Sequence, residues 1–520
     1  MSSVATPELD SKLKPAMSHS GGESYRKIFK SSALLGGARV INMVVGMARV
    51  KVMALLLGTV GVGVFSIYEQ IVYTLSAISA LGINSSGVRE VALAAGTGDP
   101  LKVAKTAKIV TRLVVILGFV GTIAMAAMAW PISRFTFKDG NHQIAIICLA
   151  ACVAMTVIGA GMAGIVQGLG RMGDLARQSV MGGVIGAVTG LALLAVFREK
   201  GIVPALLSVA GGTLFAAWWY IRKTNLPACT VTWRETIQHA RPLVTLGLAM
   251  MNAAVISSLV GYAAQALVSR RLGAAAIGIY ACAFNLSGKF VSLVIIPMWS
   301  DFFPRASAVS HDPAALNRAV NEQTEIALFL VMPGLLSTIV FAPWIIRLFY
   351  SHEFADSAVL LRWFSLGCLA SVMGGPMKMV QVAMGRSLLC LMTETFCSAV
   401  YVAAIYFGLK LWGLPGSAIA YVIFNLVQLT VSYLVAHRLG RLTWSGHTAR
   451  IVAIFGVVAA AMVGGAFALA DWQTALAGGV ATLAVSYYCL RQMIRRLGSG
   501  HRLTEFALRL PIFGRLLTAP

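Results

Sequence analysis

Charged residues are scarce in this chain of 520 residues: only 12% are Asp, Glu, Lys or Arg, whereas 58% are hydrophobic. Soluble domains usually carry about 25% charged residues, so the composition excludes an ordinary soluble protein. Long polar stretches between the apolar ones are also missing, which leaves no place for a soluble catalytic domain. The composition predicts an all-α integral membrane protein.

Several kinds of functional motif are absent as well. The chain contains no P-loop, no HExxH and no GxGxxG after a strand, which disfavours an ATP-driven pump and a metalloenzyme. The eight Cys form no CxxC pair and no cluster with His. We therefore expect no enzyme, no cofactor, no metal site and no disulfide framework.

Acidic residues are few, with 19 Asp and Glu against 42 Lys and Arg, a formal net charge of +23. In a soluble protein such an excess would suggest nucleic acid. Here the basic residues lie mainly between apolar stretches, with a roughly threefold bias to one side of the membrane. By the positive-inside rule, both termini are expected in the cytoplasm, and nucleic acid is not needed to explain the charge.

About fourteen apolar stretches are long enough to cross a bilayer, the last of them, 474–490, being the shortest. An internal repeat organises them. LGTVGVGVFS, from Leu57, matches LGAAAIGIYA, from Leu272, at an offset of 215 residues, and Gly170-Arg171 matches Gly385-Arg386 at the same offset. An even number of helices per repeat gives two lobes of the same orientation, an architecture of alternating-access transporters.

The repeat predicts two six-helix lobes followed by two extra C-terminal helices. The expected boundaries are a cytoplasmic tail at 1–30, a first lobe at 31–221, a linker at 222–241, a second lobe at 242–437, a helix pair at 438–490 and a basic amphipathic tail at 491–520. The last segment mixes Arg with Leu and Phe, which favours contact with anionic lipid at the membrane surface.

Polar side chains inside the first span form a stripe. Arg39, Asn42, Gly46 and Arg49 fall within an arc of roughly 80° on a helix. Cations at this depth are costly unless they face an aqueous cavity or an anionic ligand. The alternative is that both Arg side chains reach the membrane surface at the two ends of the helix.

A second cationic position lies in the other lobe. Asn285 and Lys289 stand four residues apart and share a helix face. Lys289 is too deep in its span to reach the surface easily, so it is expected to line a cavity, with a structural role as the alternative.

Embedded acids are candidates for ion coupling, namely Glu69, Glu325 and Glu394. Glu69 has an alternative as the salt-bridge partner of a neighbouring Arg. The other two lie near helix N-termini, where a carboxylate is stabilised in any case. Arg89 and Arg305 occupy near-corresponding repeat positions and are candidates for a gate between the lobes, or else they only mark the cytoplasmic side.

The run LLLGTVGVGVFSIYEQIVYTLSAISALGINSSGVREVA, with WPISRF and QGLGRMGDLARQS, resembles the polysaccharide-biosynthesis branch of the multidrug/oligosaccharidyl-lipid/polysaccharide (MOP) exporter superfamily. Within that branch, the chain is most similar to Wzx-type flippases of O-antigen, capsule or exopolysaccharide units, over residues 31–437. This resemblance implies alternating-access, ion-coupled flipping of undecaprenyl-diphosphate-linked oligosaccharide across the bacterial inner membrane, with a polymerase and a chain-length regulator as partners. Arg39, Arg49 and Lys289 would neutralise the diphosphate.

Three alternatives remain open. Lipid II flippases also resemble the chain, but they carry an Arg in the second helix where this sequence has Glu69. A drug/cation antiporter of the same superfamily would favour acidic cavity residues, whereas the embedded charges here lean cationic. A membrane polymerase or ligase acting on the same intermediates is the alternative from a different class.

Overall fold

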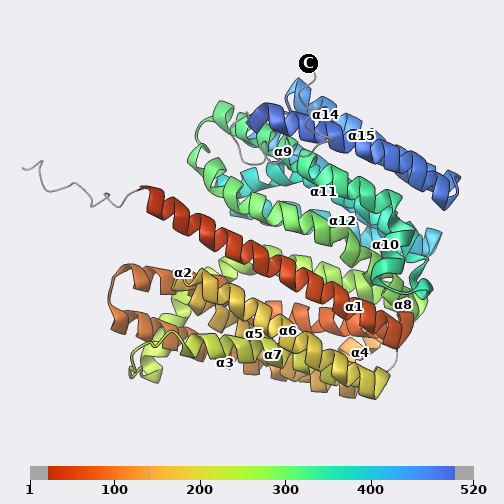
Figure 1. The fold of residues 1–520 in the computed structure, drawn as a ribbon. Helices are drawn as coiled ribbons and strands as arrows, with labels where there is room; N and C mark the ends of the chain where they lie inside the picture. Colours follow the sequence, from red (N-terminus) through yellow and green to blue (C-terminus); the bar gives the residue numbers. More distant parts are fainter. Residues whose placement is uncertain (1–20, 139, 498–520) are drawn as a thin grey trace, which may run out of the picture.

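The computed structural model describes residues 21–138 and 140–497, which are almost entirely helical (Figure 1). In this part, ten helical segments are long and apolar enough to cross a membrane. Three of them, 34–79, 172–222 and 251–308, have double length and contain a break, so counting their halves separately gives thirteen crossings. The last predicted span lies in the less apolar helix α15 (Asp471–Leu497). The predicted all-α membrane fold is confirmed.

The helices form two lobes and an outer pair, which Figure 1 shows from red through green to blue. The first lobe contains α1 (Gly21–Ser79), α2 (Ile83–Gly96), α3 (Pro100–Ala127), α4 (Ala129–Phe137), α5 (Gln143–Gly168), α6 (Met172–Phe197), the 3-10 helix η1 (Arg198–Gly201) and α7 (Ile202–Arg222). The second contains α8 (Trp233–Ala308), α9 (Pro313–Val340), α10 (Ala342–Phe349), the 3-10 helix η2 (His352–Phe354), α11 (Ser357–Ala383), α12 (Ser387–Trp412) and α13 (Leu414–Gly440). The outer pair is α14 (Gly446–Ala468) and α15.

The backbone itself records the internal repeat. Gly58 (φ 62°, ψ −164°) breaks α1, and Gly273 (φ 85°, ψ 178°), 215 residues later, breaks α8. Gly170 (φ 71°) and Gly385 (φ 70°), separated by the same offset, precede α6 and α12. Since only glycine adopts the conformation of Gly58 and Gly273 without strain, the sequence match reflects a shared backbone path. Two lobes related by the repeat are therefore present, as predicted.

The lobes touch at a local two-fold axis between α1 and α8. A Cβ atom added to Gly63 would lie 2.0 Å from the carbonyl oxygen of Ala274, and one added to Gly278 would lie 2.0 Å from that of Thr59. Gly63 and Gly278 are repeat counterparts, and so are Thr59 and Ala274. Only residues without side chains permit this approach of two backbones.

The same end of the molecule, near α4 and α10, carries a polar link between the lobes. Lys51 donates from Nζ to the carbonyl oxygen of Arg347 at 2.8 Å and also to that of Tyr350. Lys51 therefore joins the first half of α1 to α10 of the other lobe. The lobes are held together at this α4/α10 end.

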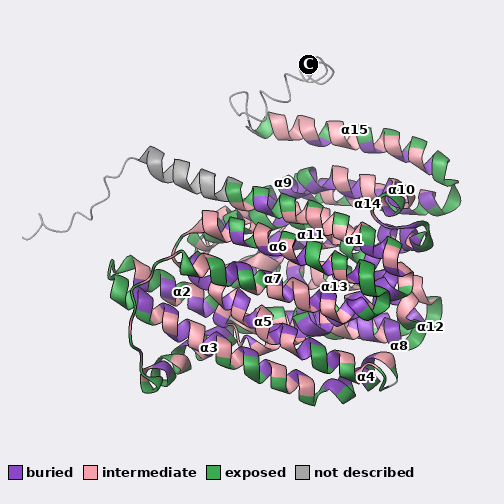
Figure 2. Ribbon diagram, turned by 60° about the horizontal axis from the view of Figure 1, so that its bottom comes forward, coloured by how far each residue is buried: buried purple, intermediate pink, exposed green. Residues whose placement is uncertain are grey.

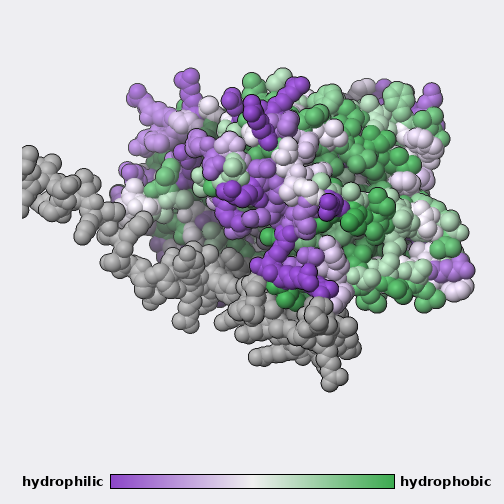
Figure 3. Space-filling model, turned by 90° about the horizontal axis from the view of Figure 1, so that it is seen from above, coloured by the Kyte–Doolittle hydropathy of each residue, from purple (hydrophilic) through white to green (hydrophobic). Residues whose placement is uncertain are grey.

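Buried residues gather in α9 and α11, while exposed and half-buried residues follow α15 (Figure 2). The outer pair is nevertheless anchored, because Arg362 of α11, only 4% exposed, donates to the carbonyl oxygen of Ala466 at 3.0 Å and pairs with Asp471 at 3.4 Å. In the face seen in Figure 3, hydrophilic residues gather toward one end and a broad hydrophobic area lies beside them. This distribution suits a multi-pass membrane protein.

Three predicted boundaries differ from the structure. α1 begins at Gly21, inside the predicted tail 1–30, since no proline interrupts the helix there. α8 begins at Trp233, inside the predicted linker 222–241. α15 continues to Leu497, so that only residues 491–497 of the predicted amphipathic tail are described, and 498–520 lie outside the described residues, as do 1–20.

A capping box explains the early start of α8. Glu235 Oε2 accepts from the Thr232 backbone N–H at 2.7 Å, and Thr232 Oγ1 accepts from the Glu235 N–H at 3.2 Å. The hydrogen bonds from the backbone and hydroxyl of Thr232 hold the pKa of Glu235 below its usual range. The helix therefore extends beyond the apolar stretch that predicted its position.

Candidate functional site

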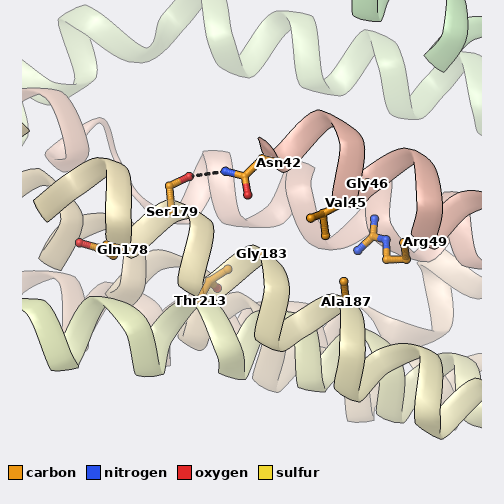
Figure 4. A pocket seen from close by; sticks show the side chains of 9 residues that line it. All are labelled: Asn42, Val45, Gly46, Arg49, Gln178, Ser179, Gly183, Ala187 and Thr213. Atoms are coloured by element: carbon orange, nitrogen blue, oxygen red, sulfur yellow. Dashed lines mark hydrogen bonds between the residues drawn. The ribbon is translucent and has the colours of Figure 1, made fainter. Parts of the chain in front are cut away.

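The polar stripe of α1 lines a pocket of about 260 Å³ that α6 and α7 close from the other side (Figure 4). We call it the first-lobe pocket. Asn42 donates from Nδ2 to Ser179 Oγ at 2.8 Å across it. Its lining residues are Asn42, Val45, Gly46, Arg49, Gln178, Ser179, Gly183, Ala187 and Thr213.

Among the described residues, three buried polar atoms of this pocket find no hydrogen-bond partner. They are Asn42 Oδ1, Arg49 Nε and Gln178 Oε1. Leaving a buried polar atom unpaired costs about 1–3 kcal/mol, so a cluster of three indicates a place for water or a polar ligand. Gly46 leaves the pocket open, because an added Cβ atom would meet nothing within 4 Å.

Arg49 of this pocket lies within electrostatic range of charged residues from both lobes. Arg49 pairs with Glu69 at 3.7 Å, and its guanidinium lies 5.6 Å from the ring centroid of Phe65. Lys289 of α8 interacts electrostatically with both Arg49 and Glu69. We call Arg49, Glu69 and Lys289 the cationic cluster, because two cations face one acid.

The acid of the cluster does not neutralise it. The Arg49–Glu69 contact is long, and the Glu69 side chain is 51% exposed, so the ion pair is weak. Lys289 is half-buried and Asn285, one turn earlier on α8, is exposed. With two cations and one acid, the cluster keeps a net positive charge, which favours an anion.

Arg39 lies outside the first-lobe pocket. It is exposed and lines a neighbouring pocket of about 450 Å³ between α1, α5, α6 and α7. The two pockets share Gln178, Ser179 and Thr213. Arg39 is therefore next to the predicted site but not in its centre.

The structure does not bring the remaining predicted acids to the cluster. Glu394 pairs with Lys378 of α11 at 2.5 Å, inside the second lobe. Glu325 accepts from Thr448 at 2.5 Å and pairs with His447 and Arg496, which fastens α9 to α14 and α15.

The two gate candidates also stay apart. Arg89 is exposed on α2 and makes no ion pair within the described residues. Arg305 pairs with Asp301 at 3.1 Å and donates to Gln323 of α9 at 3.2 Å, so it is held inside its own lobe.

Sequence reasoning missed Gln178, Ser179 and Thr213, which line the first-lobe pocket opposite Asn42. The sequence offers little indication of these three residues, because uncharged polar residues inside a span are common and often hydrogen-bond to the backbone of their own helix. The repeat offset offered one further hint, since Ser179 and Glu394 are counterparts. Only the packing of α6 against α1 reveals their place.

Comparison with known proteins adds a family and a fold. Residues 52–359 match a family model described as polysaccharide biosynthesis protein. A Shigella flexneri protein named "Putative O-antigen transporter" is 21% identical over 382 residues, which cover 70% of this chain and 87% of that protein.

Two solved structures share the architecture. The lipid II flippase MurJ in an inward closed conformation has a TM-score of 0.67 at 14% identity, covering 90% of this chain and 99% of that one. An inward-facing multidrug resistance MATE family transporter of the MOP superfamily has a TM-score of 0.65 at 19% identity, covering 77% and 95%. At these identities the likeness concerns the fold.

Proposed function

The chain belongs to the polysaccharide biosynthesis protein family, and from this membership we propose that it flips undecaprenyl-diphosphate-linked oligosaccharide units across the bacterial inner membrane. Its fold is that of MOP superfamily transporters, as the sequence predicted, and its relatives support a transporter role. The product would serve a surface polysaccharide such as O-antigen, capsule or exopolysaccharide. One observation carries the proposal: Arg49, which lines a polar pocket of the first lobe, lies within electrostatic range of Lys289 in the second lobe.

A diphosphate is costly to move through a medium of low dielectric constant, and fixed cations lower that cost. In the proposed mechanism Arg49 and Lys289 bind the diphosphate, while Asn42 and Asn285 contact it or the first sugar. Arg39, in the neighbouring pocket, meets the anion on its way in. The lipid chain stays in the bilayer.

The two lobes contact each other at the α4/α10 end, so this end is closed. This supports a state of the transporter that accepts substrate from the opposite end. Following the charge bias of the sequence, we place that opposite end and both termini in the cytoplasm. Arg89 and Arg305 lie at this cytoplasmic end, one in each lobe. They would approach each other when the lobes close on the cytoplasmic side.

We propose that ion coupling acts through Glu69, because it is the candidate acid in contact with the cationic cluster. A protonated Glu69 would release Arg49 to the diphosphate. Glu69→Gln should therefore remove the dependence of flipping on a proton gradient, measured in proteoliposomes with a fluorescent undecaprenyl-diphosphate sugar. Glu325→Gln and Glu394→Gln are the comparison variants. If Glu69→Gln keeps its dependence on the gradient and one of these two variants loses it, that residue carries the coupling instead.

Deleting the gene tests the function itself. Lipid-linked repeat units should accumulate in the cytoplasmic leaflet and surface polysaccharide should be lost, and plasmid-borne expression should restore both. Unchanged glycan display with an unchanged lipid-linked pool would contradict the proposal. Shortened chains with a normal leaflet distribution would indicate a polymerase or ligase instead.

The likeness to a lipid II flippase over 90% of the chain favours one second candidate, export of a peptidoglycan precursor. Rescue of cells depleted of their lipid II flippase would support it. The drug/cation antiporter is not supported in the same way, since the cluster between the lobes is cationic and not acidic.

Filling the first-lobe pocket should block export without unfolding the protein. Gly46→Leu places a side chain into open space, so the helix is retained while the pocket loses part of its volume. We expect export to fall at least about tenfold, as loss of a bound polar group would give. Gly464→Leu, on α14 with equally open surroundings, is the matched control. Wild-type export by Gly46→Leu would remove this pocket from the pathway.

A further inference from the structure

The second lobe contains a polar pocket that the proposed mechanism does not use. This second-lobe pocket has a volume of about 270 Å³. Helices α8, α11, α12 and α13 enclose it, and Gln70 of α1 contributes from the first lobe. It therefore opens at the boundary between the lobes.

The second-lobe pocket is the repeat counterpart of the first-lobe pocket. Six residues of the first have partners in the second at the offset of 215 residues. The pairs are Asn42 and Ser257, Val45 and Val260, Gly46 and Gly261, Ser179 and Glu394, Gly183 and Ser398, and Thr213 and Gln428. One ancestral pocket has thus been kept in both lobes, with different side chains.

The chemistry of the two pockets differs. The first presents Arg49, whose contact with Glu69 is long at 3.7 Å, whereas in the second Lys378 is neutralised by Glu394 at 2.5 Å, and Gln428 donates to the same carboxylate at 3.4 Å. The lining of the second-lobe pocket contains five aromatic rings and four side-chain amides. The rings are Tyr280, Phe284, Tyr401, Tyr421 and Phe424, and the amides are Gln70, Gln265, Asn425 and Gln428.

Such a lining suits an uncharged polyhydroxylated ligand. The C–H face of a sugar packs on aromatic rings, and its hydroxyl groups pair with amides, which donate and accept, and with carboxylates, which accept. The paired Lys378 and Glu394 offer no net positive charge to an anion, and a purely apolar ligand would leave the amides unpaired.

One buried atom points to a missing partner. Gln265 is 9% exposed, lines the pocket, and its Oε1 has no hydrogen bond. A hydroxyl donor would satisfy it. Gln70, by contrast, already donates to the Ser258 carbonyl oxygen at 3.2 Å, which fixes its position at the rim.

We propose that the second-lobe pocket binds a sugar of the substrate's head group while the cationic cluster holds its diphosphate. This inference rests on the proposed function. The two sites are neighbours, because Glu69 of the cluster and Gln70 of the pocket are consecutive residues of α1. The first-lobe pocket and cluster then recognise what all such lipids share, and the second-lobe pocket recognises the sugar that distinguishes them.

The test compares lipids with and without a sugar on the full-length purified protein. The probes are undecaprenyl diphosphate and its N-acetylglucosamine, glucose and galactose derivatives, and the readout is Kd. Wild type should bind at least one sugar-bearing lipid more tightly than the bare diphosphate. Gln265→Leu and Gln428→Leu should each reduce that advantage about fivefold to tenfold, the loss of one hydrogen bond, while leaving the Kd of the bare lipid unchanged.

Thr213 is the repeat counterpart of Gln428 and lines the first-lobe pocket, so Thr213→Val is the matched variant. It should weaken the binding of all four lipids to the same extent. Gln428 is half-buried, so its variant remains informative if Gln265→Leu fails to fold. An undiminished sugar advantage in both Gln variants, or no advantage in wild type, would overturn the sugar site and leave the proposed function standing. Failure of wild type to bind any of the four lipids would instead count against the proposed function.

Discussion

Neutralising Arg49 and Lys289 together should reduce export at least about 100-fold while the protein still inserts in the membrane. Hydrogen bonds to charged groups are worth about 1.5–3 kcal/mol each, and every 1.4 kcal/mol changes an equilibrium tenfold. The two cations come from different lobes and lie within electrostatic range of one another, so the loss of both leaves Glu69 as the charge of the cluster. The variant is Arg49→Gln with Lys289→Met, and the measurement is surface polysaccharide per inserted protein.

The single variants and a control make this result specific. Each single change should cost about tenfold, and Arg49→Lys should retain part of the activity because the charge remains. The control is Arg271→Gln, which removes a cation from the same helix as Lys289. The guanidinium carbon of Arg271 lies 4.3 Å from the ring centroid of Tyr406, and Arg271 lines neither pocket. It should export normally. Full export by the double variant would assign Arg49 and Lys289 to structure alone.

Adding one methyl group at the contact between the lobes should reduce export almost as much as the loss of both cations. In Gly63→Ala the new Cβ atom would lie 2.0 Å from the Ala274 carbonyl oxygen and 2.9 Å from the Gly278 nitrogen, both backbone atoms. Such a clash is relieved only by moving the lobes apart at the α4/α10 end. We expect the closed state of that end to be lost and export to fall about 100-fold, and the counterpart Gly278→Ala should behave alike.

The closed end can be measured directly. In a background without cysteine, Lys51→Cys and Arg347→Cys should be joined by a short bis-maleimide in the parent protein and much less in Gly63→Ala. Gly211→Ala of α7 is the control, because its Cβ atom meets nothing within 4 Å and alanine favours a helix over glycine by up to about 1 kcal/mol. Normal cross-linking and normal export in Gly63→Ala would show that this contact is not part of the transport cycle.

The fold was largely predictable because its causes are local. Apolar length predicts the spans, and a residue such as Gly58 or Gly273, with a positive φ that other residues avoid, leaves a mark in the sequence. The stripe of Asn42, Gly46 and Arg49 was likewise visible, since positions on one helix face follow from the helical period.

Partners on other helices were not predictable in this way. The sequence does not show which cation each embedded acid pairs with: Glu69 pairs with Arg49, Glu394 with Lys378 and Glu325 with Arg496. Each is an acid in an apolar stretch, and its role depends on which helix packs beside it. The pockets have the same origin, because Gln178 and Gln265 become unpaired only when neighbouring helices exclude water from them.

The sequence by itself determined a membrane protein of two repeated lobes and placed a cationic stripe on the first helix, since composition, periodicity and repeat are properties of the chain alone. The tertiary structure decided that Arg49 comes within electrostatic range of Lys289 of the other lobe, while Arg39 lines a neighbouring pocket. It also decided that the repeat encloses two pockets of different polarity. The physical reason is that the rotation and approach of packed helices depend on contacts far apart in sequence, such as that of Gly63 with Gly278.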